Sequence, residues 1–294
     1  MLHEAIQKAG EFLSFCLPFD CMSLGFMQRA LIGLLLIAPL AAVTGVQVVN
    51  SRMAFFSDAI GHSAFAGVAL GLIFAVSPNW TMPLLALLVG ILIMALKRGS
   101  RLSSDTAIGV IFSAVVAFGL AIVSRNKSVS RDMQMFLYGD ILTIGETEIA
   151  ILFFLFLLFC VFQYFSYNRL LCISVNPRLA SVHRIPVGVY QYAFTALLSL
   201  VVIFSVRAVG VILVTALLVV PAATARNLAG SSRGMFWISL GVAYVSAVSG
   251  LIVSAQEWAG TASGATVVLI SCILFCVSLL ISLFRPGKTP DTEK

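Results

Sequence analysis

Nine apolar stretches, separated by short polar or basic segments, account for most of the sequence. Each is close to the 20 or so residues that a helix needs to cross a bilayer. The pattern therefore predicts an all-α polytopic transmembrane helix bundle of eight to nine spans, at about residues 26–48, 53–76, 80–96, 106–124, 148–166, 190–206, 208–225, 234–254 and 264–284. The two stretches beside Arg207 are compatible with a tight hairpin of spans or with one broken helix.

The composition supports a membrane protein. Hydrophobic residues make up 60% of the chain and charged residues only 10%, against about 25% charged residues in soluble domains, which excludes a soluble fold. A net charge of +6 can indicate a nucleic-acid partner, but the sequence has no basic run. Its charges fall between the apolar stretches, so we expect contact with membrane lipid and no nucleic-acid partner.

The placement of the basic residues predicts orientation. If nine spans alternate in direction, 12 of the 18 Lys and Arg residues fall on the side of the C-terminus. Lys and Arg accumulate in cytoplasmic loops. We therefore expect one transmembrane domain over 1–294, with an extracytoplasmic N-terminal segment (1–25), a cytoplasmic connection (167–191) and a cytoplasmic tail (285–294).

The stretch 53–76 has only two ionisable side chains, Asp58 and His62. A spacing of four residues places both on one face of a helix, and a carboxylate beside an imidazole suits Zn²⁺, Mn²⁺ or Fe²⁺. Counted from Met53, His62 lies about 13 Å into the hydrocarbon layer, where polar residues usually mark the path of an ion. Two copies of the chain would supply four ligands. The alternative is that Ser57 or Asp58 caps the helix and His62 is a hydrogen-bonded core residue.

Small residues and one proline indicate how neighbouring helices meet. Ala59, Ser63, Gly67 and Gly71 recur every four residues beside the Asp58–His62 face, a pattern that allows close helix packing in lipid. Pro221 interrupts an apolar helix and removes one backbone hydrogen bond. We expect a kink there, which serves either as a packing joint or as a gate.

The six cysteines have no CxxC spacing, and most are expected to be buried small hydrophobic residues. Cys16 and Cys21 would be able to pair in an oxidising compartment. Cys272 and Cys276 are four residues apart, a spacing that suits soft metals, although buried thiols are the commoner interpretation.

The connection 167–191 is basic and contains PRLASVHRIP. Pro177 suits the first turn of a short surface helix and Pro186 would stop one. This segment is either an ordinary anchored loop or a docking element for a cytoplasmic partner. The sequence contains no HExxH, GxSxG or GxxxxGK[ST] motif, so it predicts neither catalysis nor ATP binding by this chain.

Four stretches resemble the membrane permease subunits of ABC importers for zinc, manganese and iron: NSRMAFFSDAIGHSAFAGVALG from Asn50, MFLYGDIL from Met135, the PRLASVHRIPVGVYQY connection, and VGVILVTALLVVPAATARNLA from Val209. The resemblance implies that Asp58 and His62 line the translocation path of a divalent metal, which is transported and not kept as a cofactor. It also implies a second permease copy or paralogue, an extracytoplasmic metal-binding protein, and the bacterial cytoplasmic (inner) membrane.

The resemblance further implies that the connection docks a separate ATPase, so the chain itself is not an enzyme. Pro177, Leu179, Ala180 and Ile185 are the expected docking residues. Two other classes remain as alternatives. A secondary metal-ion transporter or channel would need its own coupling groups, and intramembrane acids are scarce. A membrane metalloenzyme would need a third ligand and an acid or base near the pair.

Overall fold

The computed structural model describes residues 24–100, 102–124, 141–256 and 260–284. Every regular element in these ranges is helical: α2 (Gly25–Asn50), α3 (Phe56–Ile73), α4 (Pro78–Gly99), α5 (Ser104–Val123), the short 3₁₀ turn η2 (Ile141–Thr143), α7 (Glu146–Val175), α8 (Pro177–Val182), α9 (Val187–Val209), α10 (Val211–Leu228), α11 (Ser232–Ser254) and α12 (Ser263–Leu283). The predictions for the Cys16–Cys21 pair, for most of the MFLYGDIL stretch and for the tail 285–294 fall outside the described residues.

Nine long helices in the described part of the chain coincide with the nine predicted spans, which confirms the all-α bundle. Eight of them are long and apolar enough to cross a membrane. The ninth, α3, has 18 residues and carries both ionisable side chains of its stretch. The expectation of buried cysteines is wrong for Cys160, Cys272 and Cys276, which are exposed. In a membrane helix an apolar thiol can face lipid, so it does not need the protein core.

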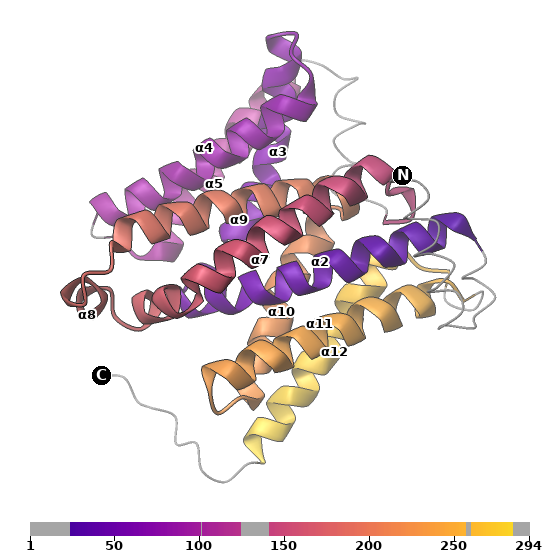
Figure 1. The fold of residues 1–294 in the computed structure, drawn as a ribbon. Helices are drawn as coiled ribbons and strands as arrows, with labels where there is room; N and C mark the ends of the chain where they lie inside the picture. Colours follow the sequence, from indigo (N-terminus) through magenta and orange to yellow (C-terminus); the bar gives the residue numbers. More distant parts are fainter. Residues whose placement is uncertain (1–23, 101, 125–140, 257–259, 285–294) are drawn as a thin grey trace.

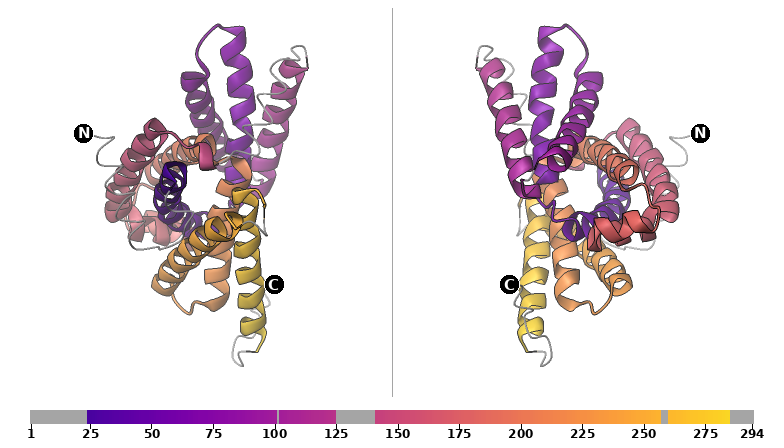
Figure 2. Two further views of the ribbon diagram at one scale, coloured as in Figure 1. Left: turned by 90° about the vertical axis from the view of Figure 1, so that its right-hand side faces the viewer. Right: turned by 90° about the vertical axis from the view of Figure 1, so that its left-hand side faces the viewer.

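The helices form three groups (Figures 1 and 2). Helices α2, α7 and α9 lie together, and in the views of Figure 2 they are seen nearly end-on. Helices α3, α4 and α5 extend from them in one direction, and α10, α11 and α12 extend in the opposite direction. Helices α3 and α10 touch each other between the two outer groups.

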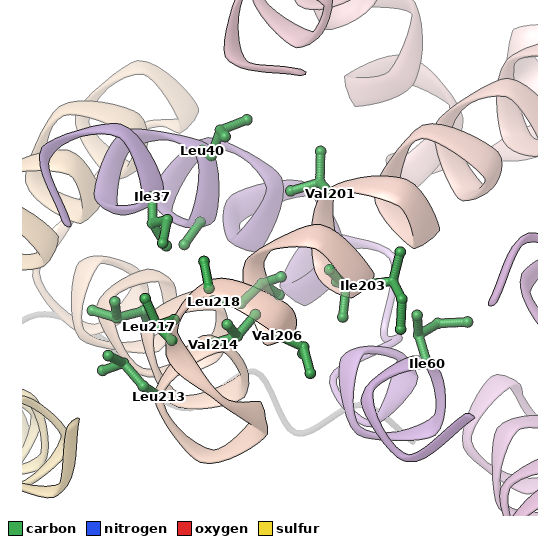
Figure 3. Close-up of a cluster of buried hydrophobic side chains, with 14 of the residues drawn as sticks. Ile37, Leu40, Ile60, Val201, Ile203, Val206, Leu213, Val214, Leu217 and Leu218 are labelled. Atoms are coloured by element: carbon green, nitrogen blue, oxygen red, sulfur yellow. The ribbon is translucent and has the colours of Figure 1, made fainter. Parts of the chain in front are cut away.

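The core lies where α2, α3, α9 and α10 meet. Figure 3 shows side chains from all four helices in one buried cluster, among them Ile37, Leu40, Ile60, Val201, Val206, Leu213 and Leu217. Because lipid tails are as apolar as these side chains, close van der Waals packing must hold the helices together. The approach is closest at Gly45 of α2, where a Cβ atom would lie 1.9 Å from the carbonyl oxygen of Leu218 in α10.

Gly210 is the only residue between α9 and α10. Its conformation decides whether the two apolar stretches beside Arg207 form a tight hairpin or a broken helix. Its φ of 90° closes α9 and opens α10, a conformation that only glycine adopts readily. Figure 1 shows α10 turning away from α9 instead of folding back along it, and α10 packs mainly on α12, α11 and α2. The two apolar stretches are therefore consecutive helices with a sharp break and not a tight hairpin.

The predicted basic side of the protein is one end of the bundle. Arg98 at the end of α4 lies over the ring of Tyr192 at 5.6 Å, and Arg169 near the end of α7 lies over the ring of Tyr190 at 5.3 Å. In the last third of α7, the Tyr167 hydroxyl donates to the Ser232 carbonyl at the start of α11 at 3.5 Å. The loops assigned to one side by charge therefore do gather at one end, and their cytoplasmic location stays a prediction.

Candidate functional site

Helix α3, which carries Asp58 and His62, is shorter than predicted. Helix α2 ends in a Schellman motif, in which Arg52 has a φ of 52° and the Met53 N–H donates to the Val48 carbonyl at 3.0 Å. Met53 therefore closes α2 instead of starting the next span. Asp58 lies in the first turn of α3, and His62 lies only about 9 Å along it.

Of the alternative interpretation, the capping part is wrong, whereas the hydrogen-bonded His62 agrees with the structure. The N-cap residue of α3 is Phe55, and no side chain makes a cap hydrogen bond there. The Ser57 hydroxyl donates to the Ala54 carbonyl at 3.5 Å instead. The first-turn position of Asp58 still matters, because the positive end of the helix dipole favours a negative charge at that place.

A hydrogen bond fixes the tautomer of His62. Its Nδ1 lies 2.9 Å from the backbone carbonyl oxygen of Asp58, and a carbonyl can only accept, so Nδ1 carries the proton. The rings of Phe65 and Phe112 meet the imidazole edge-on at 5.6 and 5.2 Å. In the neutral ring Nε2 therefore keeps its lone pair, the state in which histidine binds metals.

The side chain of Asp58 lines a cavity of about 330 Å³ between α3, α10 and α12. It is half-buried and shares the cavity wall with Thr215 of α10, whose hydroxyl donates to the Ile212 carbonyl at 3.3 Å. The cavity is otherwise apolar and is lined by Ala54, Phe55, Ile212, Thr215, Ala216, Val219 and Val268. A carboxylate in such a place has few competing partners, so a cation that arrives there meets a strong ligand.

One chain does not supply a complete metal site within the described residues. No group of three or more His, Cys, Asp or Glu side chains that could hold an ion is present in this part of the protein. Asp58 and His62 are thus two ligands on one helix turn, whereas Zn²⁺ usually takes four. Completion of the set by a second copy stays a prediction.

The small-residue stripe of α3 packs against α4. A Cβ atom on Gly67 would lie 2.8 Å from the Met82 Cα, and one on Gly71 would lie 2.9 Å from the Thr81 hydroxyl. Ala59 and Ser63 are fully buried. The stripe therefore holds α3 within its own three-helix group, while the Asp58 side of the helix is left to α10.

Pro221 is buried inside α10, one turn after the point where α10 touches α2. A Cβ atom on Gly45 would also lie 3.3 Å from the Ala222 side chain, next to the proline. The surroundings of Pro221 are thus a packed contact between two helices. This arrangement suits the packing-joint interpretation better than a gate.

The predicted surface helix exists as α8, but its neighbours differ from the prediction. Helix α7 continues to Val175, so it occupies the first part of the predicted connection 167–191. Asn176 caps α8, because its side-chain oxygen accepts hydrogen bonds from the N–H groups of Arg178 and Leu179. Pro177 occupies the first helical position. Pro186 does not stop α8, which ends at Val182; it precedes α9.

The expected docking residues differ in exposure. The side chain of Ala180 is fully buried within this chain and is not available to a partner. Ile185 is partly buried, whereas Pro177 and Leu179 are exposed. Val182 is 75% exposed and is not among the docking residues predicted from the sequence. The sequence of so short a helix does not indicate which of its apolar side chains face away from the bundle.

A family model covers most of the chain. The description of that model is the ABC 3 transport family, and it matches residues 23–282. The chain belongs to this family. Membership confirms the resemblance found in the sequence, and together with the apolar helices it identifies a multi-pass protein of the inner membrane.

Curated relatives and solved structures match this ABC 3 chain over nearly its full length. The high-affinity zinc uptake system membrane protein ZnuB of Haemophilus influenzae is 32% identical, covering 85% of this chain and 95% of that protein. The manganese import system permease protein ScaB of Streptococcus gordonii is 33% identical, covering 87% and 91%. The structure of PsaBC from Streptococcus pneumoniae in complex with Fab gives 30% identity and a TM-score of 0.74, covering 91% and 94%.

Proposed function

We propose that this chain is the membrane permease subunit of an ATP-driven importer of a divalent transition-metal ion. The observation that carries the proposal is the Asp58–His62 pair, in which an acidic ligand and an imidazole with a free Nε2 share one helix turn. Relatives at 32% and 33% identity are named for zinc uptake and manganese import.

In this function Asp58 and His62 replace part of the hydration shell of the passing ion. Two permease chains related by a two-fold axis, or a pair of paralogues, bring two carboxylates and two imidazoles together. Binding must be weak enough for release, because a closed four-ligand site of structural-zinc strength, about 10 to 16 kcal/mol, would trap the ion. A site formed between two chains meets this need, since a small movement between them separates the ligands.

The energy comes from a separate ATPase, and an extracytoplasmic metal-binding protein delivers the ion. Leu179 and Val182 of α8 are the exposed apolar residues that suit an ATPase contact. Helix α8 touches both α7 and α9, so a push on it reaches long helices of the bundle. Among similar relatives, zinc and manganese systems are nearly equal in identity, so competition between the ions must identify the cargo.

The test is metal uptake by the complete complex in sealed vesicles, with Zn²⁺, Mn²⁺ and Fe²⁺ offered separately and in competition. We expect uptake that requires ATP and the ATPase subunit and that is abolished in the Asp58→Ala variant. Flux at the same rate without any ATPase would contradict the proposal and support a secondary transporter or channel.

A further inference from the structure

A second and larger cavity lies away from the Asp58 site. It measures about 630 Å³ and is bounded by α2, α7 and α11. Helix α7 and helix α12, which borders the Asp58 cavity, lie on different sides of the molecule in Figure 2. This groove is therefore not part of the proposed metal path.

The groove contains a polar side chain that has no partner. Gln163 is 8% exposed, and neither amide atom makes a hydrogen bond in the described part of the protein. Leaving a buried amide unsatisfied is costly. Gln163 lines the groove, and although both amide atoms are enclosed in this rotamer, a turn of the side chain toward the groove would let the amide pair with a hydrogen-bonding group of a ligand.

One end of the groove is basic and polar, and the remainder is apolar. Arg233, Tyr167 and Asn168 line it near the start of α11, and no Asp or Glu is among its described lining residues. Pro39, Leu40, Val43, Phe156 and Phe159 supply most of the apolar wall, whereas Leu171 lies beyond Asn168 on α7, at the basic end. The ligand that fits this distribution has a negative head and a hydrocarbon tail.

The dimensions fit one leaflet of a bilayer. From Asn168 to Phe156 the α7 wall runs 12 residues, or about 18 Å, which compares with about 15 Å for half of the hydrocarbon layer. Gln163 lies about 7 Å below Asn168 on the same helix. A glycerol ester group lies below the phosphate of a phospholipid in the same way.

We propose that this groove binds one anionic phospholipid. The phosphate lies at Arg233, an ester carbonyl accepts a hydrogen bond from the Gln163 amide, and one acyl chain fills the space between α2, α7 and α11. Basic pockets between transmembrane helices bind anionic headgroups by the same charge complementarity. The proposal is independent of the metal path, since no residue lines both cavities.

Native mass spectrometry of the purified, delipidated complex tests the proposal, with phosphatidylglycerol and phosphatidylcholine of identical acyl chains as probes. We expect one tight phosphatidylglycerol per permease chain. Arg233→Gln should weaken its binding about fivefold, since one basic contact is lost, and weaken phosphatidylcholine by less, because the choline ammonium offsets the charge of its phosphate. Gln163→Leu should weaken both lipids, because both carry the ester group.

Arg226→Gln is the matched control, because Arg226 is exposed at the same end of the bundle but does not line the groove. It should bind both lipids as the wild type does. Three outcomes would overturn the proposal: equal binding of the two lipids by the wild type, an Arg226→Gln loss as large as that of Arg233→Gln, or a second protein chain that covers the groove and excludes both lipids.

Discussion

The imidazole Nδ1 of His62 donates to the backbone carbonyl oxygen of Asp58 at 2.9 Å. One helix turn thus orients a metal ligand by means of the backbone of its neighbour. A ring held in this way loses little side-chain freedom when it binds a cation. The bond lies within one chain, so in the proposed path each copy would present an imidazole that is already oriented.

Loss of either ligand should reduce uptake strongly. Asp58→Asn keeps the shape of the side chain but removes its charge, and His62→Ala removes the imidazole. We expect metal uptake to fall by roughly tenfold or more in each, since even residues that only support a ligand affect metal affinity by about 10- to 100-fold. Asp105→Asn, at an exposed position outside the proposed path and outside α8, is the control. Near-normal uptake by both ligand variants would remove the pair from the path.

Thr215 should act through Asp58. In Thr215→Val a methyl group replaces the hydroxyl that lines the cavity with Asp58 and donates to the Ile212 carbonyl at 3.3 Å, with little change in side-chain volume. We expect weaker apparent affinity for the metal, by up to about tenfold, with a smaller change in maximal uptake. Thr224→Val on the same helix is the matched control, because its hydroxyl likewise donates to a backbone carbonyl, that of Val220 at 2.8 Å, but does not line the cavity. Equal effects in the two variants would indicate a general effect on α10.

Gly45 should not tolerate a side chain. The added methyl group of Gly45→Ala would lie 1.9 Å from the Leu218 carbonyl oxygen, so α2 and α10 must separate. We expect destabilisation of about 1 to 3 kcal/mol or more, measured as a lower midpoint of thermal unfolding in detergent. Gly241→Ala, which has open space around it, should be neutral or stabilise the protein by up to about 1 kcal/mol. A Gly45→Ala midpoint equal to that of Gly241→Ala would contradict the contact.

The position of each span could be predicted because membrane helices reveal themselves by length and hydropathy alone. The helix ends could not. Arg52, Ala75 and Arg184 all have a φ between 52° and 58°, where a Schellman motif usually has glycine. Because these positions are not glycine, the sequence does not indicate the turns after α2, α3 and α8. The predicted span 53–76 is therefore longer than α3, which runs from Phe56 to Ile73.

Contacts between segments that are distant in the sequence likewise could not be predicted from it. Asp58 and His62 could be found because ionisable groups are rare in an apolar helix, but Thr215 is an ordinary residue in such a helix. Only the packing of α10 against α3 gives it a role. Similarly, the burial of Ala180 and the exposure of Val182 follow from how α8 lies on α7 and α9.

The orientation of the bundle can be tested with single cysteines in a chain whose native cysteines have been removed. Ser181→Cys, at an exposed site of α8, should react with an impermeant thiol reagent only after the cells are opened. Asn79→Cys, exposed at the start of α4, should react in intact cells. Both follow from the excess of Lys and Arg on the side of α8, and the reverse labelling would invert the bundle and remove the ATPase from α8.

The exposed face of α8 provides the test that separates an ATP-driven importer from the other transport classes. Leu179 and Val182 are 55% and 75% exposed. If they anchor the ATPase, replacing both with Asp should cost about 2 kcal/mol or more of binding at each position, as at other interface hot spots.

The double variant should release the ATPase during purification and abolish ATP-driven uptake in vesicles, while Asp58 and His62 remain intact. Leu102→Asp is the control, since Leu102 is exposed and apolar but lies in the connection between α4 and α5. It should keep the ATPase bound, because its position is outside the proposed contact. Full transport by the double variant would place the energy source elsewhere and favour a secondary carrier or channel.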